Sequence, residues 1–152
     1  MPRVGLNDPA TLLITDFSRE QAWTVLEERS IDDAMRDMVC AGVDALLVVR
    51  SDIVTGLITS YDIQGRRPLE FLHASGCASR GEIQVCHVMN PWGRVAVLDW
   101  RFISGSRVSH VEDWARNTRA THALLMEQVD GIEYVRGLLS RAHVERMLGR
   151  RL

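Results

Sequence analysis

Two stretches decide the fold of this chain: residues 45–49, which read ALLVV, and residues 56–59, which read GLIT. The first is a run of apolar, partly β-branched residues, which is typical of a strand buried on both faces. The second begins with a glycine and ends with a hydroxyl residue. Because the polar pair Ser51 and Asp52 marks a turn between them, the two runs predict consecutive strands.

The same arrangement recurs about 80 residues later, as ALLM at residues 123–126 and GLLS at residues 137–140. In both copies a helix signal precedes the first run and another follows the second run. The first copy also has a short strand pattern at residues 23–26. The sequence therefore predicts two β-α-β-β-α modules.

Helix signals in the first copy are local and specific. Ser30 is followed three residues later by Asp33, the spacing of an N-terminal capping box. Gly42 suits the left-handed residue that ends a helix. In the second copy we expect a short strand at residues 95–98 and a helix at about residues 109–119, capped by Ser109 or Ser106.

From these signals we expect four segments, with the second module divergent from the first. They are a lead-in at residues 1–19, a first domain at residues 20–75, a linker with a short helix at residues 76–91, and a second domain at residues 92–152. The predicted fold class is α/β (α+β).

Composition excludes several function classes. The chain has 152 residues and a net charge of −2, which argues against a nucleic-acid binder with a basic face. All 18 basic residues are arginine, so a lysine Schiff base and a Walker A phosphate loop are excluded.

Metal, catalytic and membrane signals are weak or missing from the sequence. The five histidines have no paired ligand spacing, and no GxSxG elbow occurs, so we predict no metal site, no catalytic residues and no enzyme activity. Three cysteines without a CxxC pair favour a reduced, cytoplasmic protein. We expect no membrane span, because no apolar run approaches about 18 residues.

The two apolar runs, extended to residues 41–49 and 56–63, resemble those of a cystathionine β-synthase (CBS) domain. Residues 85–91, VCHVMNP, resemble the lead-in to a second CBS domain. The resemblance to a tandem CBS pair, or Bateman module, covers about residues 12–149 and is closer in the first copy. It implies two modules packed sheet to sheet about a pseudo-twofold axis, with AMP, ADP, ATP or S-adenosylmethionine bound in clefts between them. It also implies pairing into dimers.

The turn at Thr59 suits such a ligand. A strand that ends there and a helix that begins at Ser60 or Tyr61 would leave unpaired N–H groups for a phosphate. The hydroxyl of Thr59 could donate to the same phosphate, and Asp62 could accept from both ribose hydroxyls. The remaining candidates are Gly56, where a backbone can approach closely, Val25, which could flank an adenine ring, and Thr24, whose backbone could read its edge.

A weaker second site would comprise Ser140, Arg141 and His143. The imidazole of His143 stands where the resemblance implies an aspartate, and it cannot accept from two hydroxyls as a carboxylate can. The second site is therefore either vacant or binds a different group, and Arg141 could reach a phosphate.

We predict a stand-alone regulatory module with no cofactor, an adenine nucleotide as regulatory ligand, a homodimeric assembly and an unidentified regulated protein as partner. The alternative is a ligand-free structural or dimerisation module, because Thr59 and Asp62 also have the spacing of a capping box. An enzyme ranks last.

Overall fold

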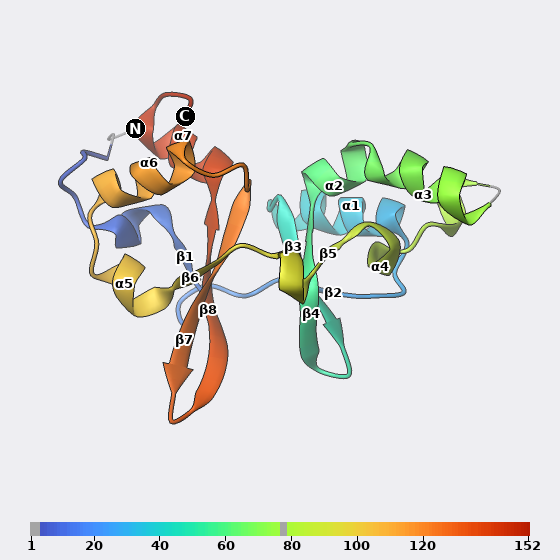
Figure 1. The fold of residues 1–152 in the computed structure, drawn as a ribbon, viewed down its shortest axis with the longest axis horizontal. Coiled ribbons are helices and arrows are strands. Elements are labelled where there is room, and N and C mark those ends of the chain that lie inside the picture. Colours follow the sequence, from blue (N-terminus) through green and yellow to red (C-terminus); the bar gives the residue numbers. More distant parts are fainter. Residues whose placement is uncertain (1–3, 77–78) are drawn as a thin grey trace. The chain divides into compact units, whose positions relative to one another are not determined.

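A computed structural model describes residues 4–76 and 79–152 of the chain. These residues form two compact units (Figure 1). The first unit, residues 22–95, contains the first sequence copy. The second unit combines residues 96–152 with residues 4–21. Residues 1–3 of the expected lead-in, and Cys77 in the expected linker, lie outside the described residues, and the domain boundaries remain a prediction.

The first unit has a four-stranded sheet in the order β2-β3-β4-β5. Strands β2 and β3 are parallel, whereas β4 is antiparallel to both β3 and β5. The elements are β2 (Thr24–Leu26), α1 (Ile31–Ala41), β3 (Ala45–Arg50), β4 (Ile53–Thr59), α2 (Ser60–Gln64), α3 (Arg67–Ser75), the 3-10 turn η2 (Arg80–Glu82), α4 (Val85–Val88), β5 (Asn90–Pro91) and the 3-10 turn η3 (Trp92–Arg94).

Helix α1 confirms the capping prediction. The hydroxyl of Ser30 accepts a hydrogen bond from the backbone N–H of Asp33 at 3.1 Å. Gly42 ends the helix in the left-handed conformation, with φ of 70°. The apolar face of α1 packs on the sheet and forms one core with residues of α2, α4 and three of the strands. Its buried members are Val25, Ile31, Ala34, Met38, Leu46, Val48, Ile58, Ile63, Ile83, Val85 and Val88.

The second unit repeats this plan, with a sheet in the order β1-β8-β7-β6. Strands β6 and β7 are parallel, and β8 is antiparallel to β7 and β1. The elements are the 3-10 turn η1 (Ala10–Leu13), β1 (Thr15–Asp16), β6 (Val97–Asp99), α5 (Trp100–Ser104), α6 (Val108–Arg116), β7 (His122–Val129), β8 (Ile132–Ser140) and α7 (Arg141–Leu148).

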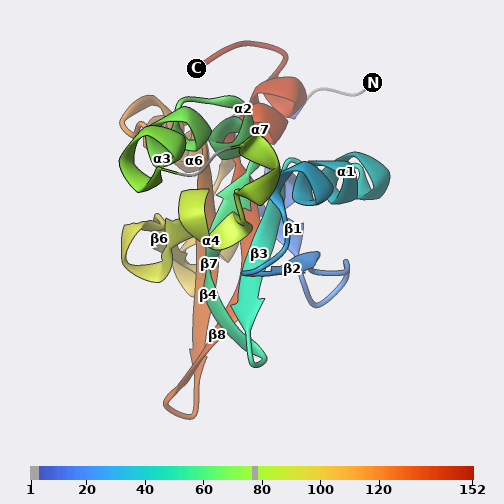
Figure 2. The ribbon, with the colours of Figure 1, turned by 90° about the vertical axis from the view of Figure 1, so that its right-hand side faces the viewer.

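In each unit the hairpin of the two long strands extends beyond the helices, β3–β4 in the first and β7–β8 in the second (Figures 1 and 2). Helices α1, α2 and α3 of the first unit, and α6 and α7 of the second, lie toward the opposite end of their sheet, where the first long strand begins and the second one ends (Figure 1). This is the end at which both candidate sites lie.

One feature of both sheets was not predicted. A two-residue strand pairs with the strand that carries the glycine shared by the two copies: β5 pairs with β4 at Gly56, and β1 pairs with β8 at Gly137. A Cβ atom at Gly56 would overlap the carbonyl oxygen of Asn90, and one at Gly137 would overlap that of Thr15. Both glycines are therefore required by the close approach of a neighbouring strand.

The predicted capping residue of α6 is wrong. The helix begins at Val108, and the N–H of Arg107 donates to Nδ1 of His110 at 3.2 Å. Neither Ser106 nor Ser109 caps the helix: Ser106 is buried, and its hydroxyl donates to the carbonyl of Phe102 at 2.6 Å. The imidazole of His110 thus takes the role that a capping box gives to the acidic residue at its third helical position, and no hydroxyl caps this helix.

Candidate functional site

The register of the first sheet brings several predicted residues to one end. Thr24 pairs with Leu47 in β3, and Thr59 pairs with Ala45. Since Ala45 begins β3, Thr24 and the β4–α2 turn lie at the same end of the sheet. The side chains of Thr24 and Tyr61 are exposed there, whereas Thr59 is buried.

Thr59 and Asp62 form a reciprocal capping box. The Thr59 hydroxyl accepts from the N–H of Asp62 at 3.2 Å and donates to Oδ2 of Asp62 at 3.0 Å. The N–H of Thr59 donates to the same Oδ2 at 2.9 Å. The hydroxyl proton that we expected to face a phosphate is therefore directed at the aspartate.

Two residues that the sequence analysis did not select complete the surroundings of Asp62. The side-chain amide of Asn90 donates to Oδ2 at 2.7 Å, and Arg67 approaches Oδ1 at 3.2 Å. The Asp62 side chain is 12% exposed. The Asn-Pro pair that forms β5 was the sequence signal that could have drawn attention to Asn90. Only the pairing of β5 with β4 shows that Asn90 faces Asp62.

The N–H groups of the β4–α2 turn are more occupied than expected. The N–H of Ser60 donates to the carbonyl of Asp44 at 2.9 Å, and the N–H of Asp62 donates to Thr59. The expectation that the first helical turn offers unpaired N–H groups is therefore wrong for these two residues. A phosphate at this turn would have to bind other groups, or replace the present acceptors of the Ser60 and Asp62 N–H groups.

Val25 and Gly56 are used by the fold itself. The side chain of Val25 is 5% exposed and belongs to the core of the first unit, so it offers little surface to a ring. The close backbone approach at Gly56 is that of Asn90. Both residues remain predictions as ligand contacts, but each has a structural reason to be present.

In the second unit Ser140 and His143 are also brought together at the start of α7. The Ser140 hydroxyl accepts from the N–H of His143 at 3.4 Å. Arg141 donates to the carbonyls of Ala115, Thr118 and Ala120, around the C-terminal end of α6. This guanidinium is thus held against the negative end of a helix rather than extended toward a phosphate.

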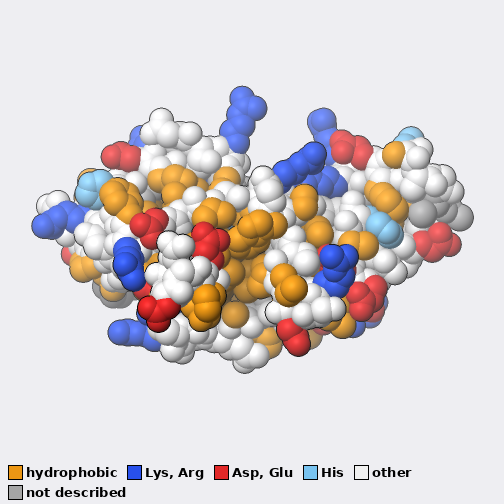
Figure 3. All heavy atoms as spheres, turned by 60° about the horizontal axis from the view of Figure 1, so that its bottom comes forward, with side chains coloured by type: hydrophobic (Ala, Val, Ile, Leu, Met, Phe, Trp, Pro, Cys, Tyr) orange, Lys and Arg blue, Asp and Glu red, His pale blue; other side chains and the backbone are white. Residues whose placement is uncertain are grey.

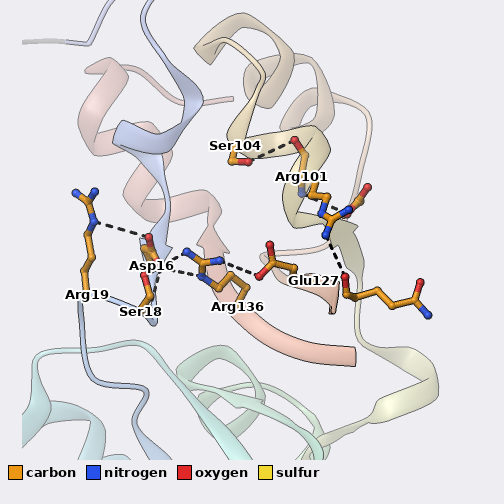
Figure 4. Close-up of polar contacts among 9 residues, drawn as sticks. Asp16, Ser18, Arg19, Arg101, Ser104, Glu127 and Arg136 are labelled. Atoms are coloured by element: carbon orange, nitrogen blue, oxygen red, sulfur yellow. Dashed lines mark hydrogen bonds and ion pairs between the residues drawn. The ribbon is translucent and has the colours of Figure 1, made fainter. Parts of the chain in front are cut away.

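A group of charges lies elsewhere in the second unit, between β1, β7 and β8 (Figure 4). Arg136 donates to Glu127 at 2.8 Å and to Asp16 at 3.4 Å, and its guanidinium lies 4.4 Å from the centroid of the Trp100 ring. Burial acts to raise the pKa of Asp16, but hydrogen bonds from Ser18 and the charge of Arg136 outweigh it and lower the pKa. Because each charge has a partner, the arrangement ties β1 to the sheet.

Two negative findings concern the described residues. His, Cys, Asp and Glu side chains at residues 4–76 and 79–152 form no group of three that could hold a metal ion. In the same residues no helix is both long and apolar enough to cross a membrane.

Proteins similar to this chain are found by comparing structures and not by comparing sequences. The sequence matches no protein-family model. A search of curated proteins also finds no match. Solved structures, in contrast, match nearly the whole chain.

A CBS-domain-containing protein from Agrobacterium tumefaciens is 18% identical, with a TM-score of 0.63 over 97% of this chain and 98% of its own. The structure of the Arabidopsis thaliana CBS-pair protein CBSX2 in complex with AMP is 20% identical, with a TM-score of 0.59 over 91% of this chain and 94% of its own. A GMP reductase from Trypanosoma brucei is 17% identical, with a TM-score of 0.60 over 89% of this chain but 26% of its own. At these low identities the structural likeness shows the fold alone, and this chain has the fold of a tandem pair of CBS domains.

Proposed function

We propose that this chain is a regulatory module that binds an adenine nucleotide (AMP, ADP, ATP or S-adenosylmethionine) at the β4–α2 end of its first unit and passes its ligand state to a partner protein. We also propose that the protein is a cytoplasmic homodimer without enzymatic activity. The residues assigned to the ligand are Thr24, Val25, Gly56, Thr59, Ser60, Tyr61 and Asp62.

The single observation that carries this proposal is the convergence of Thr24, Thr59 and Asp62 at one end of the first sheet. Two exposed side chains, those of Thr24 and Tyr61, lie at the same end of the sheet as the carboxylate of Asp62. The solved structure of CBSX2, which has the same fold, holds AMP, and this supports an adenine nucleotide as the ligand class.

A specific observation also favours the second reading, a structural or dimerisation module without a ligand. The capping box at Thr59 and the contacts of Asp62 with Asn90 and Arg67 give both side chains a complete structural role. A residue that caps a helix can also bind a ligand, because hydrogen bonds can be exchanged. The two readings therefore differ in an outcome that can be measured.

Thermal unfolding with and without each nucleotide separates the two readings. A ligand at 100 times its Kd stabilises the native state by about 2.7 kcal/mol. For a chain of this size the melting temperature rises by roughly 5–10 °C. A rise with one adenine compound supports the sensing function, whereas no rise at millimolar concentration of any of the four contradicts it and leaves the structural reading.

Asp62→Asn is the variant that locates the site, because the asparagine keeps an oxygen for the N–H of Thr59 but loses the charge. We expect it to lose most of the nucleotide-induced rise. Asp33→Asn is the matched control, since Asp33 also lies in the first turn of a helix of the same unit, beside Arg36. Equal losses in the two variants would mean that the effect is on stability and not on binding.

A further inference from the structure

The outer part of the β7–β8 hairpin has no counterpart in the first unit. Strands β3 and β4 have six and seven residues, whereas β7 and β8 have eight and nine. Residues 128–134 are all exposed, and none of them belongs to the core of the second unit. Because the first unit forms a similar four-stranded sheet without this extension, the fold does not require it.

The extension has an apolar face. Val129 lies opposite Ile132 in the β7–β8 ladder, and Glu127 lies opposite Tyr134, so these side chains share one face of the hairpin. Ile132 is 56% exposed and Tyr134 is 50% exposed. Glu133, which stands between them in the sequence, turns to the opposite face. Exposed apolar side chains that adjoin one another in this way are typical of an interaction surface.

The edge of β8 is open along the same residues. Strand β1 accompanies β8 no farther than Arg136, whose carbonyl accepts from the N–H of Phe17 at 2.9 Å. In the part of the chain that the structure describes, no strand lies on this side of residues 132–135. Every second residue of such an edge turns its N–H and C=O outward, where another chain can pair with them. On the edge of β7, in contrast, Arg101 donates to the Gln128 carbonyl at 3.3 Å.

Charge restricts what can pair with this edge. Residues 127–134 hold three acidic side chains and no basic one: Glu127, Asp130 and Glu133. Arg136 neutralises Glu127, whereas the other two carboxylates are exposed. A strand beside β8 would place alternate side chains next to Glu133 on one face and next to the apolar residues on the other. A segment in which basic and apolar residues alternate therefore complements the edge.

We propose that the edge of β8 at residues 132–135 binds an extended segment of a partner protein, in which basic and apolar side chains alternate. The apolar side chains of the segment pack beside Ile132 and Tyr134, and its basic side chains lie beside Glu133. This surface belongs to the second unit. The inference thus goes beyond the proposed nucleotide site and holds whether or not a nucleotide binds there.

A second copy of this chain does not complement the edge. Antiparallel pairing of two β8 edges with Ile132 opposite Tyr134 places the Glu133 side chains of the two copies directly opposite each other. Like charges in that position destabilise a sheet. The occupant is therefore a segment of opposite charge.

Fluorescence anisotropy with three labelled peptides tests the pattern that the edge recognises. RVRVRVR has the proposed alternation, RRVVVRR has the same composition in blocks, and EVEVEVE has the opposite charge. We expect RVRVRVR to bind at least about tenfold more tightly than either of the others. Equal binding of RVRVRVR and RRVVVRR would show attraction by charge alone, and no binding at about 1 mM would show no site; either result overturns the proposal.

Two substitutions with matched controls locate the site. Ile132→Ser should weaken RVRVRVR binding about fivefold or more, whereas Ile53→Ser, at the exposed tip of the first hairpin, should leave it unchanged. Glu133→Arg should weaken it about fivefold and strengthen EVEVEVE, whereas Glu70→Arg changes the net charge equally on α3 and should do neither. Equal effects of a variant and its control would overturn the assignment to β8.

Hydrogen exchange measured by NMR tests the pairing itself. Bound RVRVRVR should slow the exchange of outward amides within residues 132–135 about tenfold or more and leave the β3–β4 hairpin unchanged. Binding without this protection would overturn strand pairing. Light scattering tests the other occupant: if Ile132→Ser converted a dimer of this chain to a monomer, the edge would belong to a second copy and the proposal would be wrong.

Discussion

Gly56 shows how one residue can have a role different from the one its pattern predicts. The sequence places Gly56 in the ligand site because a residue without a Cβ atom lets a backbone approach closely. In the structure the approaching group is the carbonyl of Asn90 in β5. The equivalent residue of the second copy, Gly137, meets the carbonyl of Thr15 in the same way.

Gly56→Ala should therefore destabilise the protein whether or not a ligand is present. The added Cβ overlaps backbone that cannot rotate away, so β5 must shift, and we expect a loss of at least about 2 kcal/mol in the free energy of unfolding. Urea unfolding measures this loss. Gly93→Ala is the control, because no atom lies within 4 Å of the added Cβ and the change should stay within about 1 kcal/mol. Similar stabilities for the two variants would contradict the argument.

At the scale of elements, short strands are held by side chains as much as by the ladder. Strand β1 has two residues, and its attachment to β8 is reinforced by the ion pair of Arg136 with Asp16, while a second ion pair holds Arg136 to Glu127 of β7. Arg136 is 29% exposed and these carboxylates 20% and 19%, so the pairs are screened less than surface pairs.

Arg136→Met should weaken the docking of β1. Methionine keeps apolar contact with Trp100 but leaves two partly buried carboxylates without their partner, and we expect a loss of about 1–3 kcal/mol. The control is Arg19→Met, which removes an 86% exposed arginine that lies 4.0 Å from the same Asp16. An exposed pair contributes about 0–1 kcal/mol, so an equal loss in the two variants would contradict this role of Arg136.

The C-terminal residues are attached to α6 through Glu112. Arg150 lies 2.6 Å from Glu112 and Arg116 lies 2.7 Å from it, while the Glu112 side chain is 8% exposed. Hydrogen bonds from Arg150 lower the pKa of Glu112; burial opposes this effect, and hydrogen bonds from Arg116 add to it.

This pKa predicts acid sensitivity. Because the pKa is lower in the folded state than in the unfolded state, the contribution of Glu112 to stability is fully present above the unfolded value of about 4.3 and is lost as the pH falls through the folded value. Glu112→Gln should remove part of the stability at neutral pH and reduce its decline below about pH 4.5. Urea midpoints across this range test the prediction, and Glu133→Gln, which changes an exposed hairpin carboxylate, should keep the wild-type decline.

At the scale of the whole molecule, the two units differ in their capacity to bind a nucleotide. The first offers a carboxylate at Asp62. The second has His143 at the corresponding helix position, and its Arg141 is engaged with carbonyls at the end of α6. Loss of a charge-assisted hydrogen bond weakens binding by about ten- to a hundredfold.

We therefore expect calorimetry to find one tightly bound nucleotide per chain. Two equivalent sites in the wild-type protein would contradict this expectation. His143→Asp supplies the missing carboxylate and should add a second, weaker site. If this variant still binds one nucleotide, the second unit is blocked by something other than its histidine.

Exposed apolar side chains support the dimer prediction. Besides Ile132 and Tyr134 of the β7–β8 hairpin, which we assign to another partner, the chain exposes Val39, Leu69 and Phe102, each by more than 60%. The face that carries the hairpin tip shows hydrophobic side chains among acidic and basic ones (Figure 3). Light scattering at tens of micromolar should give twice the chain mass of 17.2 kDa, and the mass of one chain would contradict the prediction.

Much of the fold could be predicted because it depends on neighbours in sequence. The cap at Ser30, the left-handed Gly42 and the apolar strand at Ala45 follow from side-chain chemistry within a few residues. The pairing of Thr59 with Asp62 as a capping box was likewise visible in their spacing. The cap at His110 was missed because hydroxyl and acidic residues are the usual signals for a helix start.

By itself the sequence thus determined the repeated β-α-β-β-α order and the local pairing of Thr59 with Asp62. Only the tertiary structure decided that β5 extends the first sheet and that β1 extends the second. It also decided that Asn90, 28 residues from Asp62, donates a hydrogen bond to one oxygen of its carboxylate. The physical reason is that strand pairing uses backbone groups, which every residue has. Which backbone meets which is settled only when the cores of the two units have packed.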